Sequence, residues 1–379
     1  MEAGAGLVPG VSKIAVLRAN AIGDFIFTLP ALVALRAAYP AAEIVLLGKA
    51  WHAAFLAGRP GPVDRVEVVP AVRGVGAPMD ATEDRAAQEA FIARMVRERF
   101  DLALQLYGGG RYANPFLRRL GARLTTGLKT PDAISLDRWV PYVYWQNEVL
   151  RHLEVVRLAG ATPIDVVPKV EVTEADRAEA RLVAADSERP LVVLNPGASD
   201  PERMWPTAKF AAVGDALAEA GARVVITGAE WEAPLAVRVR EGMHHLAEDT
   251  TGRLSLGGLA GLLERCAVVV SNDTGPLHLA AAVGAASVGM YWCINLCNAG
   301  PVTTARQRPL VSWKLDCSIC GVDRGKARCD HTPSFLDAIS TDEVIVAALE
   351  LFRSETGQGD QIGAELAGPL PKRILAGIP

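Results

Sequence analysis

The chain has 379 residues, of which half are apolar and 22% are charged. A chain of this length is too long for one compact core, and its composition predicts a globular protein of two domains. Its net charge of −4 gives no support for nucleic-acid binding, and no uninterrupted apolar run of about 18 residues predicts a membrane span. The Gly/Ala-rich beginning lacks the pattern of a signal peptide, so we expect a cytoplasmic protein.

The first half of the chain alternates apolar strands with helices. Strands are predicted at 13–18, 44–47, 66–69, 101–106 and 123–128. After the turn at 19–30, helices are predicted up to residue 38, around 51–56, and at 86–99 and 147–160. This alternation is typical of a parallel sheet with helices on both faces.

A second series of the same kind follows an extended, Pro-containing segment at 161–172, which we interpret as the domain linker. A charged helix is expected at 175–185. Strands are then predicted at 191–194, 223–227, 267–270 and 287–291, and helices from 207, at 259–265, after 275 and at 341–353. We expect an N-terminal domain at 1–165, a C-terminal domain at 166–345 and a C-terminal tail at 346–379.

One stretch joins a strand, a polar turn and a helix. An apolar run at 267–270 leads into the turn at Asp273, Thr274 and Gly275, and an Ala-rich helix follows. Such a turn presents backbone N–H groups and the positive end of the helix dipole to an anion. His278 falls in the first helical turn, beside any anion held there. We interpret the stretch as an anion site, and a well-capped helix without a ligand is the structural alternative.

A second turn of this design lies near the start of the chain, at Gly23 and Asp24. Gly23 lets a ligand approach the backbone closely, and the helix N-terminus favours the ionised form of Asp24. A carboxylate that faces a cleft can take a proton from an attacking sugar hydroxyl, so Asp24 is a candidate general base. The structural alternative is that Asp24 only caps its helix.

Two further turns carry charged side chains. Arg203 follows the turn Asn195-Pro-Gly-Ala-Ser199, and its permanent charge and fork-shaped guanidinium suit a phosphate group. A later turn holds Gly228, Glu230 and Glu232, and either carboxylate could accept hydrogen bonds from ribose hydroxyls. A surface arginine and an ordinary solvated turn are the structural alternatives.

Three motifs, taken in order, resemble the ADP-heptose:lipopolysaccharide heptosyltransferases of glycosyltransferase family 9. They are GDFIFTLP at 23–30, PGASDPERMWP at 196–206 and DTGPLHLAAA at 273–282. The first motif alone has little specificity, but the three together in this order are highly specific. The resemblance extends from about Ser12 to the helix after residue 340.

The resemblance implies an α/β protein with the GT-B fold, in which two doubly wound Rossmann-like domains face each other across a cleft. The N-terminal domain would bind the acceptor and the C-terminal domain the nucleotide sugar, with inversion and without a cofactor or catalytic metal. The implied donor is ADP-heptose, and the acceptor is a glycan, lipid-linked group, protein or small molecule, at the inner face of the membrane. Another nucleotide sugar, or a catalytically silent nucleotide-sugar-binding protein, remains an alternative.

The resemblance also implies roles for single residues. Asp24 matches the general base of the family, with Gly23 and Asn20 on the acceptor side. Glu232 matches the ribose-binding acid better than Glu230 does, and Leu254 would line the adenine pocket. The donor-binding positions are Asp273, Thr274, Gly275, His278, Arg203, Glu232, Gly228 and Leu254.

Two positions depart from the family pattern. Phe27 stands where these enzymes often carry histidine, and Arg203 stands where they often carry lysine. Both departures leave the acceptor open. The segment 111–145 is rich in aromatic and basic residues and is a candidate acceptor surface.

The six cysteines include a compact group near the C-terminus. Cys317, Cys320, Cys329 and His331 could complete a tetrahedral site for a structural zinc or iron ion. Reduced thiols or one local disulfide are the alternatives. We expect no catalytic metal there.

Overall fold

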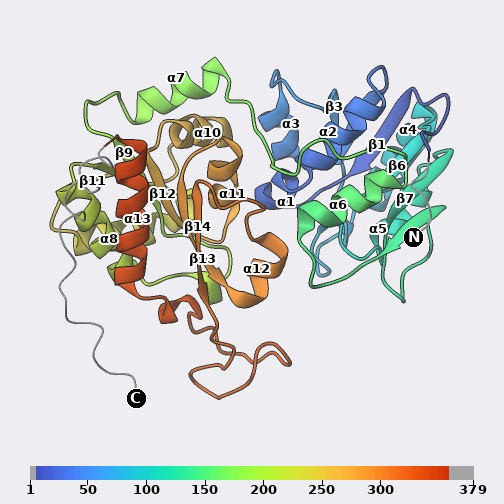
Figure 1. Cartoon of the computed structure of the whole chain (residues 1–379). Coiled ribbons are helices and arrows are strands. Elements are labelled where there is room, and N and C mark those ends of the chain that lie inside the picture. Colours follow the sequence, from blue (N-terminus) through green and yellow to red (C-terminus); the bar gives the residue numbers. More distant parts are fainter. Residues whose placement is uncertain (1–5, 358–379) are drawn as a thin grey trace, which may run out of the picture.

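The computed structural model describes residues 6–357 and consists of two lobes that lie side by side (Figure 1). Each lobe is built on a six-stranded sheet, with the strand orders β3-β2-β1-β6-β7-β8 and β11-β10-β9-β12-β13-β14. Numbered along the chain within each sheet, both orders read 3-2-1-4-5-6, which is the arrangement of a doubly wound Rossmann fold. The expected α/β architecture of two such domains is confirmed.

The N-terminal sheet forms because its central strands are almost entirely apolar and therefore buried on both faces. The residues of β1 from Ile14 to Leu17 are fully buried, and Ile14 pairs in parallel with both Ile44 and Leu102. The strands of this sheet are β1 (Lys13–Leu17), β2 (Glu43–Gly48), β3 (Arg65–Val68), β6 (Leu102–Gln105), β7 (Leu124–Lys129) and β8 (Arg138–Pro141), and β4 (Val72–Arg73) pairs with β5 (Gly76–Ala77). The helices are α1 (Ile22–Ile26), α2 (Leu29–Ala38), α3 (Ala50–Leu56), α4 (Arg85–Glu98), α5 (Ala113–Arg118) and α6 (Glu148–Arg157).

The C-terminal sheet has the same design, with the valine-rich β9 and β12 at its centre. Its strands are β9 (Leu191–Asn195), β10 (Arg223–Ile226), β11 (Ala247–Asp249), β12 (Val268–Asn272), β13 (Ser287–Trp292) and β14 (Gln307–Ser312). The α-helices are α7 (Glu174–Val183), α8 (Thr207–Glu219), α9 (Ala233–Gly242), α10 (Leu256–Glu264), α11 (Gly275–Ala282), α12 (Cys293–Ala299) and α13 (Thr341–Glu355). Single 3-10 turns lie at η1 (Pro201–Arg203), η2 (Glu230–Glu232) and η3 (Leu336–Ala338).

The expected domain limits, residues 165 and 345, can be compared with the bounds of the helices. Residue 165 lies in the segment between α6 and α7, whereas residue 345 lies inside α13. This helix packs against α8 and buries Val344 and Phe352 in the C-terminal core, so residues up to Glu355 belong to that lobe. Residues 358–379 of the expected tail lie outside the described residues.

The two lobes share apolar packing as well as a linker. One cluster of buried side chains contains Ile14 and Leu35 of the first lobe together with Val193 and Leu279 of the second. Arg59 of the first lobe also pairs with Asp176 of α7 at 2.7 Å, where both side chains are largely buried. Between residues 6 and 357, no helix combines the length and the apolar character that crossing a bilayer requires.

Candidate active site

A cleft of about 680 Å³ lies between the lobes, at the edge where the parallel strands of both sheets end. Topology explains its position, because ligands of doubly wound sheets bind outside the carboxyl ends of the strands. Asn20 does not line the cleft, and its carbonyl oxygen instead accepts a hydrogen bond from Trp51 Nε1 at 3.3 Å. The expected residues that line it are Gly23, Asp24, Arg203, Gly228, Glu232, Leu254, Asp273, Thr274, Gly275 and His278.

Asp24 reaches the cleft from the first turn of α1. Its Oδ2 accepts a hydrogen bond from the backbone N–H of Ala21 at 3.1 Å, and its Oδ1 lies 3.2 Å from Arg18 Nη2. The side chain of Arg18 is buried, whereas that of Asp24 is 38% exposed. Asp24 therefore caps its helix and also presents a held carboxylate to the cleft.

The N-termini of α1 and α11 meet across the domain boundary, and glycines permit the contact. A Cβ atom on Gly275 would lie 2.1 Å from Ile22 Cγ2, and one on Gly23 would lie 2.8 Å from His278 Cδ2. Such distances are far below van der Waals contact, so neither position admits a side chain without movement. The close neighbour of Gly23 is thus helix α11, and residues of both helix starts line the cleft.

Asp273 contacts the charged side chains on the side of the cleft formed by the C-terminal lobe, here called the C-terminal wall. It is almost fully buried, and its Oδ1 lies 3.1 Å from His278 Nε2. Arg203 Nη1 donates a hydrogen bond to the carbonyl oxygen of Asp273 at 3.1 Å and lies 3.6 Å from its Oδ2. This arrangement fixes the histidine and the arginine beside the start of α11.

The helix start itself is open to a ligand. Thr274 is the N-cap residue of α11, but its side chain makes no capping hydrogen bond. Instead its hydroxyl accepts a hydrogen bond from Asn195 Nδ2 at 3.3 Å. Since the N–H groups of a first helical turn have no partner within the helix, they and the dipole can receive an anion.

Glu232 lies at the opposite end of the same wall. Its carboxylate is largely buried, and its Oε2 accepts a hydrogen bond from Ala229 N at 2.7 Å. Burial raises the pKa of Glu232, against the lowering effect of that hydrogen bond. A Cβ atom on Gly197 would lie 1.8 Å from Glu232 Oε1, so the glycine makes room for the carboxylate. Glu230, by contrast, is exposed and does not line the cleft.

A second carboxylate, Glu148 at the start of α6, lines the cleft beside Asp24 and was missed by the sequence analysis. Arg18 joins the two, since its Nη2 also lies 3.3 Å from Glu148 Oε2. Burial alone would raise the pKa of Glu148, but His152 and the charges of Arg18 and Arg151 lower it to about 2. Burial and the charge of Arg18 lower the pKa of His152, against the raising effect of its contacts with Glu148 and with the carbonyl oxygen of Phe27.

Several uncharged side chains of the cleft were also not predicted as site residues. Asn295 and Asn298 come from α12, a helix that the sequence analysis did not predict. Trp231 lies at the rim and is 62% exposed. An aromatic residue between the two acids of the turn 230–232 was the available signal for Trp231. No local pattern distinguishes the two asparagines.

Phe27 also lines the cleft, and its ring packs edge-on against His278 with the ring centroids 4.6 Å apart. The aromatic side chain thus fills the space between the lobes beside the start of α11. A histidine at this position would bring a second imidazole to His278.

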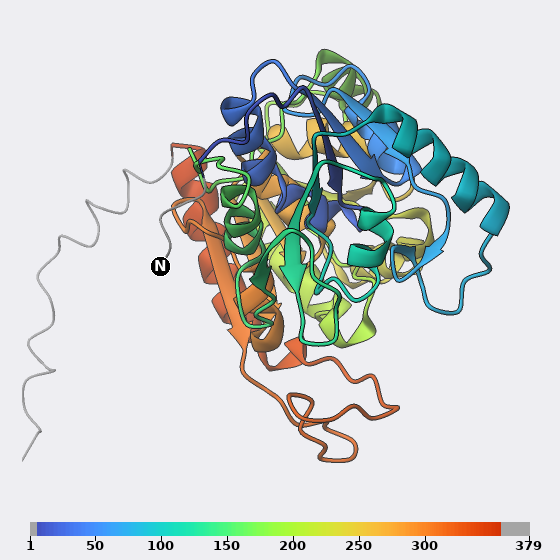
Figure 2. The same cartoon turned by 90° about the vertical axis from the view of Figure 1, so that its right-hand side faces the viewer.

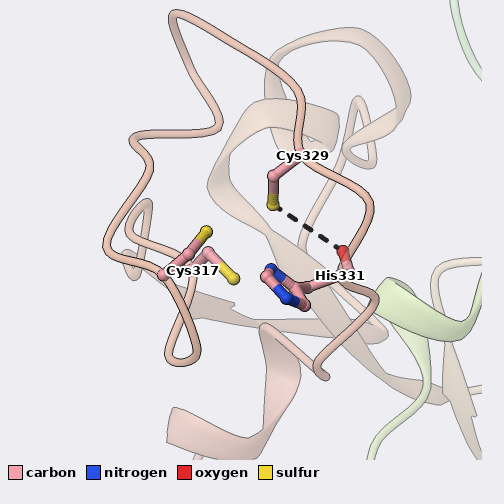
Figure 3. Close-up of side chains that lie close together, drawn as sticks. Cys317, Cys329 and His331 are labelled. Carbon is pink, nitrogen blue, oxygen red and sulfur yellow. Dashed lines mark hydrogen bonds between the residues drawn. The ribbon is translucent and has the colours of Figure 1, made fainter.

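The cysteine loop (residues 313–335) follows β14 and projects from the C-terminal lobe in both views (Figures 1 and 2). Within it, the side chains of Cys317, Cys329 and His331 converge (Figure 3). With Cys320 they offer four ligand atoms that all lie within 4.8 Å of one another. The cysteines form no disulfide, and His331 Nδ1 is a buried nitrogen without a hydrogen-bond partner in the described chain.

Backbone N–H groups favour the thiolate form of two cysteines of this loop. Those of Ile319 and Cys320 act on Cys317, and that of Val322 acts on Cys320, to lower their pKa values against burial. Such N–H groups offset the charge of metal-bound thiolates. The donor set and its geometry therefore fit a tetrahedral metal ion.

Residues 89–328 match the family model of glycosyltransferase family 9 (heptosyltransferase). The match covers more than half of the chain. The chain belongs to glycosyltransferase family 9. It is therefore a glycosyltransferase, and the cleft between its lobes is the candidate active site.

Proteins named as heptosyltransferases are similar to this chain in sequence and in fold. Lipooligosaccharide heptosyltransferase 2 of Haemophilus ducreyi is 23% identical to this glycosyltransferase over 359 residues, which are 88% of this chain and 97% of the relative. The solved structure of E. coli ADP-heptose lps heptosyltransferase II has a TM-score of 0.72 at 18% identity and covers 91% of this chain and 99% of that one. The solved structure of the iron-containing glycosyltransferase TibC from enterotoxigenic E. coli has a TM-score of 0.52 at 12% identity and covers 92% of this chain and 78% of that one. Both solved structures share the fold of this glycosyltransferase.

Proposed function

We propose that this glycosyltransferase moves a heptose from ADP-heptose to an acceptor hydroxyl, with inversion and with Asp24 as the general base. The proposal rests on one observation: Asp24 lines the same cleft as the anion-binding start of α11. A base on one wall and a site for the leaving diphosphate on the other are what a single displacement needs. The names of the related heptosyltransferases support heptose as the sugar.

Asp24 would remove the proton as the acceptor oxygen bonds to the anomeric carbon. Its 3.2 Å contact with Arg18 holds one oxygen, and the exposed part of the carboxylate faces the cleft. Glu148, the second carboxylate, has a pKa of about 2 and therefore carries no proton to donate at neutral pH. Glu148 is therefore no candidate for a general acid, and the single displacement proposed here needs only one base.

The C-terminal wall would hold the donor. The diphosphate would lie at Thr274 and Gly275, where the helix dipole and Arg203 oppose the charge that develops on the leaving group. Asp273 would keep His278 and Arg203 in place through the contacts described above. Further along the wall, the ribose would bind at Gly228 and Glu232, and the adenine would pack against Leu254.

The acceptor side would include the exposed segment Val143–Trp145 at the mouth of the cleft. Tyr144 and Trp145 are each more than half exposed and pack edge-on, with centroids 4.7 Å apart. Asn298, which lines the cleft, donates a hydrogen bond to the carbonyl oxygen of Tyr144 at 2.8 Å. A glycan or lipid-linked acceptor at the inner face of a membrane would pack on these rings, because Tyr and Trp suit an apolar–polar boundary.

A structural zinc or iron ion is part of the same proposal. Cys317, Cys320, Cys329 and His331 would bind it, and no catalytic step would involve it. Elemental analysis of the purified protein tests this, with about one ion per chain expected. Replacing Cys320 by Ser should lower the metal content, and a protein that takes up neither zinc nor iron would contradict the proposal.

The base assignment is tested with Asp24→Asn. We expect transfer from ADP-heptose to fall by about 10²–10⁴-fold, because general-base catalysis contributes that much. ADP should bind nearly as tightly as to the wild type, as measured by calorimetry, because Asp24 lies outside the donor wall. The exposed Asp80→Asn variant serves as the control. Full activity of Asp24→Asn would refute the assignment.

The donor is tested by thermal shift with a panel of nucleotide sugars. A tight donor raises the melting temperature by mass action, so ADP-heptose should give the largest rise. A larger rise with another nucleotide sugar would identify a different donor. Binding without any transfer or hydrolysis would favour a catalytically silent protein.

A further inference from the structure

The cysteine loop contacts the segment that carries Arg203. Residues 199–205, here called the Arg203 turn, lie at the same carboxyl edge of the sheet as the cysteine loop, which follows β14. Phe335 N donates a hydrogen bond to the carbonyl oxygen of Glu202 at 3.0 Å, and Ser334 Oγ donates one to that of Met204 at 2.5 Å. The end of the loop therefore pairs directly with the backbone on both sides of Arg203.

Arg324 provides a charged connection between the same two segments. Its Nη2 lies 2.6 Å from Glu202 Oε1, and the two side chains are only 7% and 8% exposed. This contact is an ion pair without hydrogen-bond alignment, since Oε1 accepts no hydrogen bond. A buried pair of this kind holds its partners in place, because separating them leaves a charge uncompensated.

The other side of the same guanidinium faces the metal ligands. Arg324 Nη1 lies 2.9 Å from the carbonyl oxygen of Cys329, 3.1 Å from its sulfur and 3.4 Å from the carbonyl oxygen of His331. The position of Arg324 thus depends on where Cys329 and His331 lie. A metal ion that binds both ligands would fix that position.

The Arg203 turn in turn meets the donor wall. Arg203 binds Asp273 through Nη1, and Trp205 N donates a hydrogen bond to Asn272 Oδ1 at 3.0 Å. Glu202 directly precedes Arg203 in the single turn η1. Movement of Glu202 would therefore displace Arg203 relative to the start of α11.

From this chain of contacts we infer that the metal-loaded cysteine loop positions Arg203 for the donor diphosphate, with Arg324 and Glu202 as the positioning residues. Metal binding and donor binding are then coupled, and coupling between two sites acts equally in both directions. This inference rests on the proposed donor and metal sites. It adds that loss of the metal weakens donor binding through Arg203.

The first experiment compares ADP affinity in zinc-loaded and chelator-stripped protein by calorimetry. Stripping the zinc should lower the affinity of the wild type for ADP about tenfold, which is within the usual range of coupling between sites. In Arg203→Ala, stripping should change the affinity by less than about twofold, because the coupled contact is already absent. An equal loss in both backgrounds would overturn the role of Arg203. In the reverse direction, saturating ADP should raise the affinity of the protein for zinc, measured by competition with the chelator. The factor should equal the one by which stripping weakens ADP binding.

The second experiment removes the connection but keeps the ligands. Arg324→Gln should still bind zinc, yet bind ADP about tenfold more weakly than the wild type. The control Lys326→Gln removes an exposed positive charge from the same loop, paired only with Asp323, and should retain both properties. ADP affinity of Arg324→Gln equal to that of the wild type would overturn the positioning role, whether or not the protein binds zinc.

Hydrogen exchange separates this inference from the donor assignment. The amides of Glu202, Arg203 and Trp205 are hydrogen-bonded. Their exchange should become faster in Arg324→Gln and in stripped protein, with no ligand present. Faster exchange without any ADP binding would refute the donor site and keep the connection. Unchanged exchange in both would overturn the connection itself.

Discussion

At the scale of single residues, the site depends on buried charged side chains that hold the side chains lining the cleft in place. Asp273 orients His278 and contacts Arg203, and Arg18 lies between Asp24 and Glu148. A buried arginine between two carboxylates holds both in place through charge-assisted contacts. The side chains around Asp24 and those around the start of α11 are thus each held by one buried charged residue, Arg18 and Asp273.

Gly275→Ala tests the contact between the two helix starts. The added Cβ would lie 2.1 Å from Ile22 Cγ2, so α1 and α11 must separate. We expect kcat to fall by about 10²-fold, since a misplacement of about 1 Å costs that much. Steady-state kinetics of Gly61→Ala, whose Cβ would meet nothing within 4 Å, provides the control. Ile22→Ala in the same chain should restore part of the rate, and an unaffected kcat in Gly275→Ala would contradict the tight packing.

At the scale of elements, the short helices α1 and α11 bring side chains to the cleft, and their N-terminal ends differ in how they are capped. The helix α1 has a single carboxylate in its first turn, whereas α11 has a proline there and an uncapped start.

Away from the site, Asp215 on α8 binds the end of α9. It accepts hydrogen bonds from the backbone N–H groups of His244 and His245 at 2.9 Å each.

Asp215 predicts acid sensitivity of this helix pair. Burial alone would raise the pKa of Asp215, but the hydrogen bonds from His244 and His245 lower it to about 2. A depressed pKa stabilises the fold above the unfolded-state value near 3.8, and this stability is lost as the pH falls toward 2. Asp215→Asn should lower the free energy of unfolding at pH 6 by at most about 2 kcal/mol.

Denaturant unfolding of both proteins at several pH values measures this effect. The two curves should converge near pH 2, where the wild type has lost the contribution of Asp215. The exposed Glu188→Gln variant should follow the wild type. A constant difference between wild type and Asp215→Asn from pH 6 to pH 2 would contradict the assignment.

At the scale of the whole molecule, the cleft exists because two similar lobes are held at a set distance. Apolar side chains of both lobes form one cluster, and α1 packs against α11 beside the cleft. The ion pair of Arg59 with Asp176 adds a polar connection, and the Arg59 guanidinium also lies over the Phe55 ring at 4.1 Å. These contacts set how the two lobes meet at the cleft that Asp24 and the start of α11 line.

Arg59→Ala should destabilise the connection between the lobes. Removing one partner of a buried pair leaves Asp176 uncompensated, so we expect a loss of about 3 kcal/mol in the free energy of unfolding. Protease cleavage in the linker 161–172 should also become faster. Arg94→Ala, which breaks an exposed pair with Glu67, should cost less than about 1 kcal/mol. Equal effects of the two substitutions, measured by denaturant unfolding, would contradict the interface role of Arg59.

The sequence alone was sufficient for features that depend on close neighbours along the chain. Runs such as 191–194 predicted strands because their residues are apolar throughout, and the alternation of strands with helices predicted doubly wound sheets. The motifs at 23–30 and 273–282 identified both walls of the cleft, because strand ends of parallel sheets lie at one edge. The aromatic turn residue Trp231 and the short helix α12 escaped this reasoning.

Only the tertiary structure decided which distant residues meet. Glu148 reaches Arg18 from 130 residues away, Gly275 packs on Ile22, and Arg324 pairs with Glu202. Such pairs follow from how the lobes and loops pack, and no local periodicity encodes them. The sequence therefore determined the two sheets and the chemistry at their edges. The packing of the lobes decided which carboxylates share an arginine, and the position of the cysteine loop decided that it contacts the Arg203 turn.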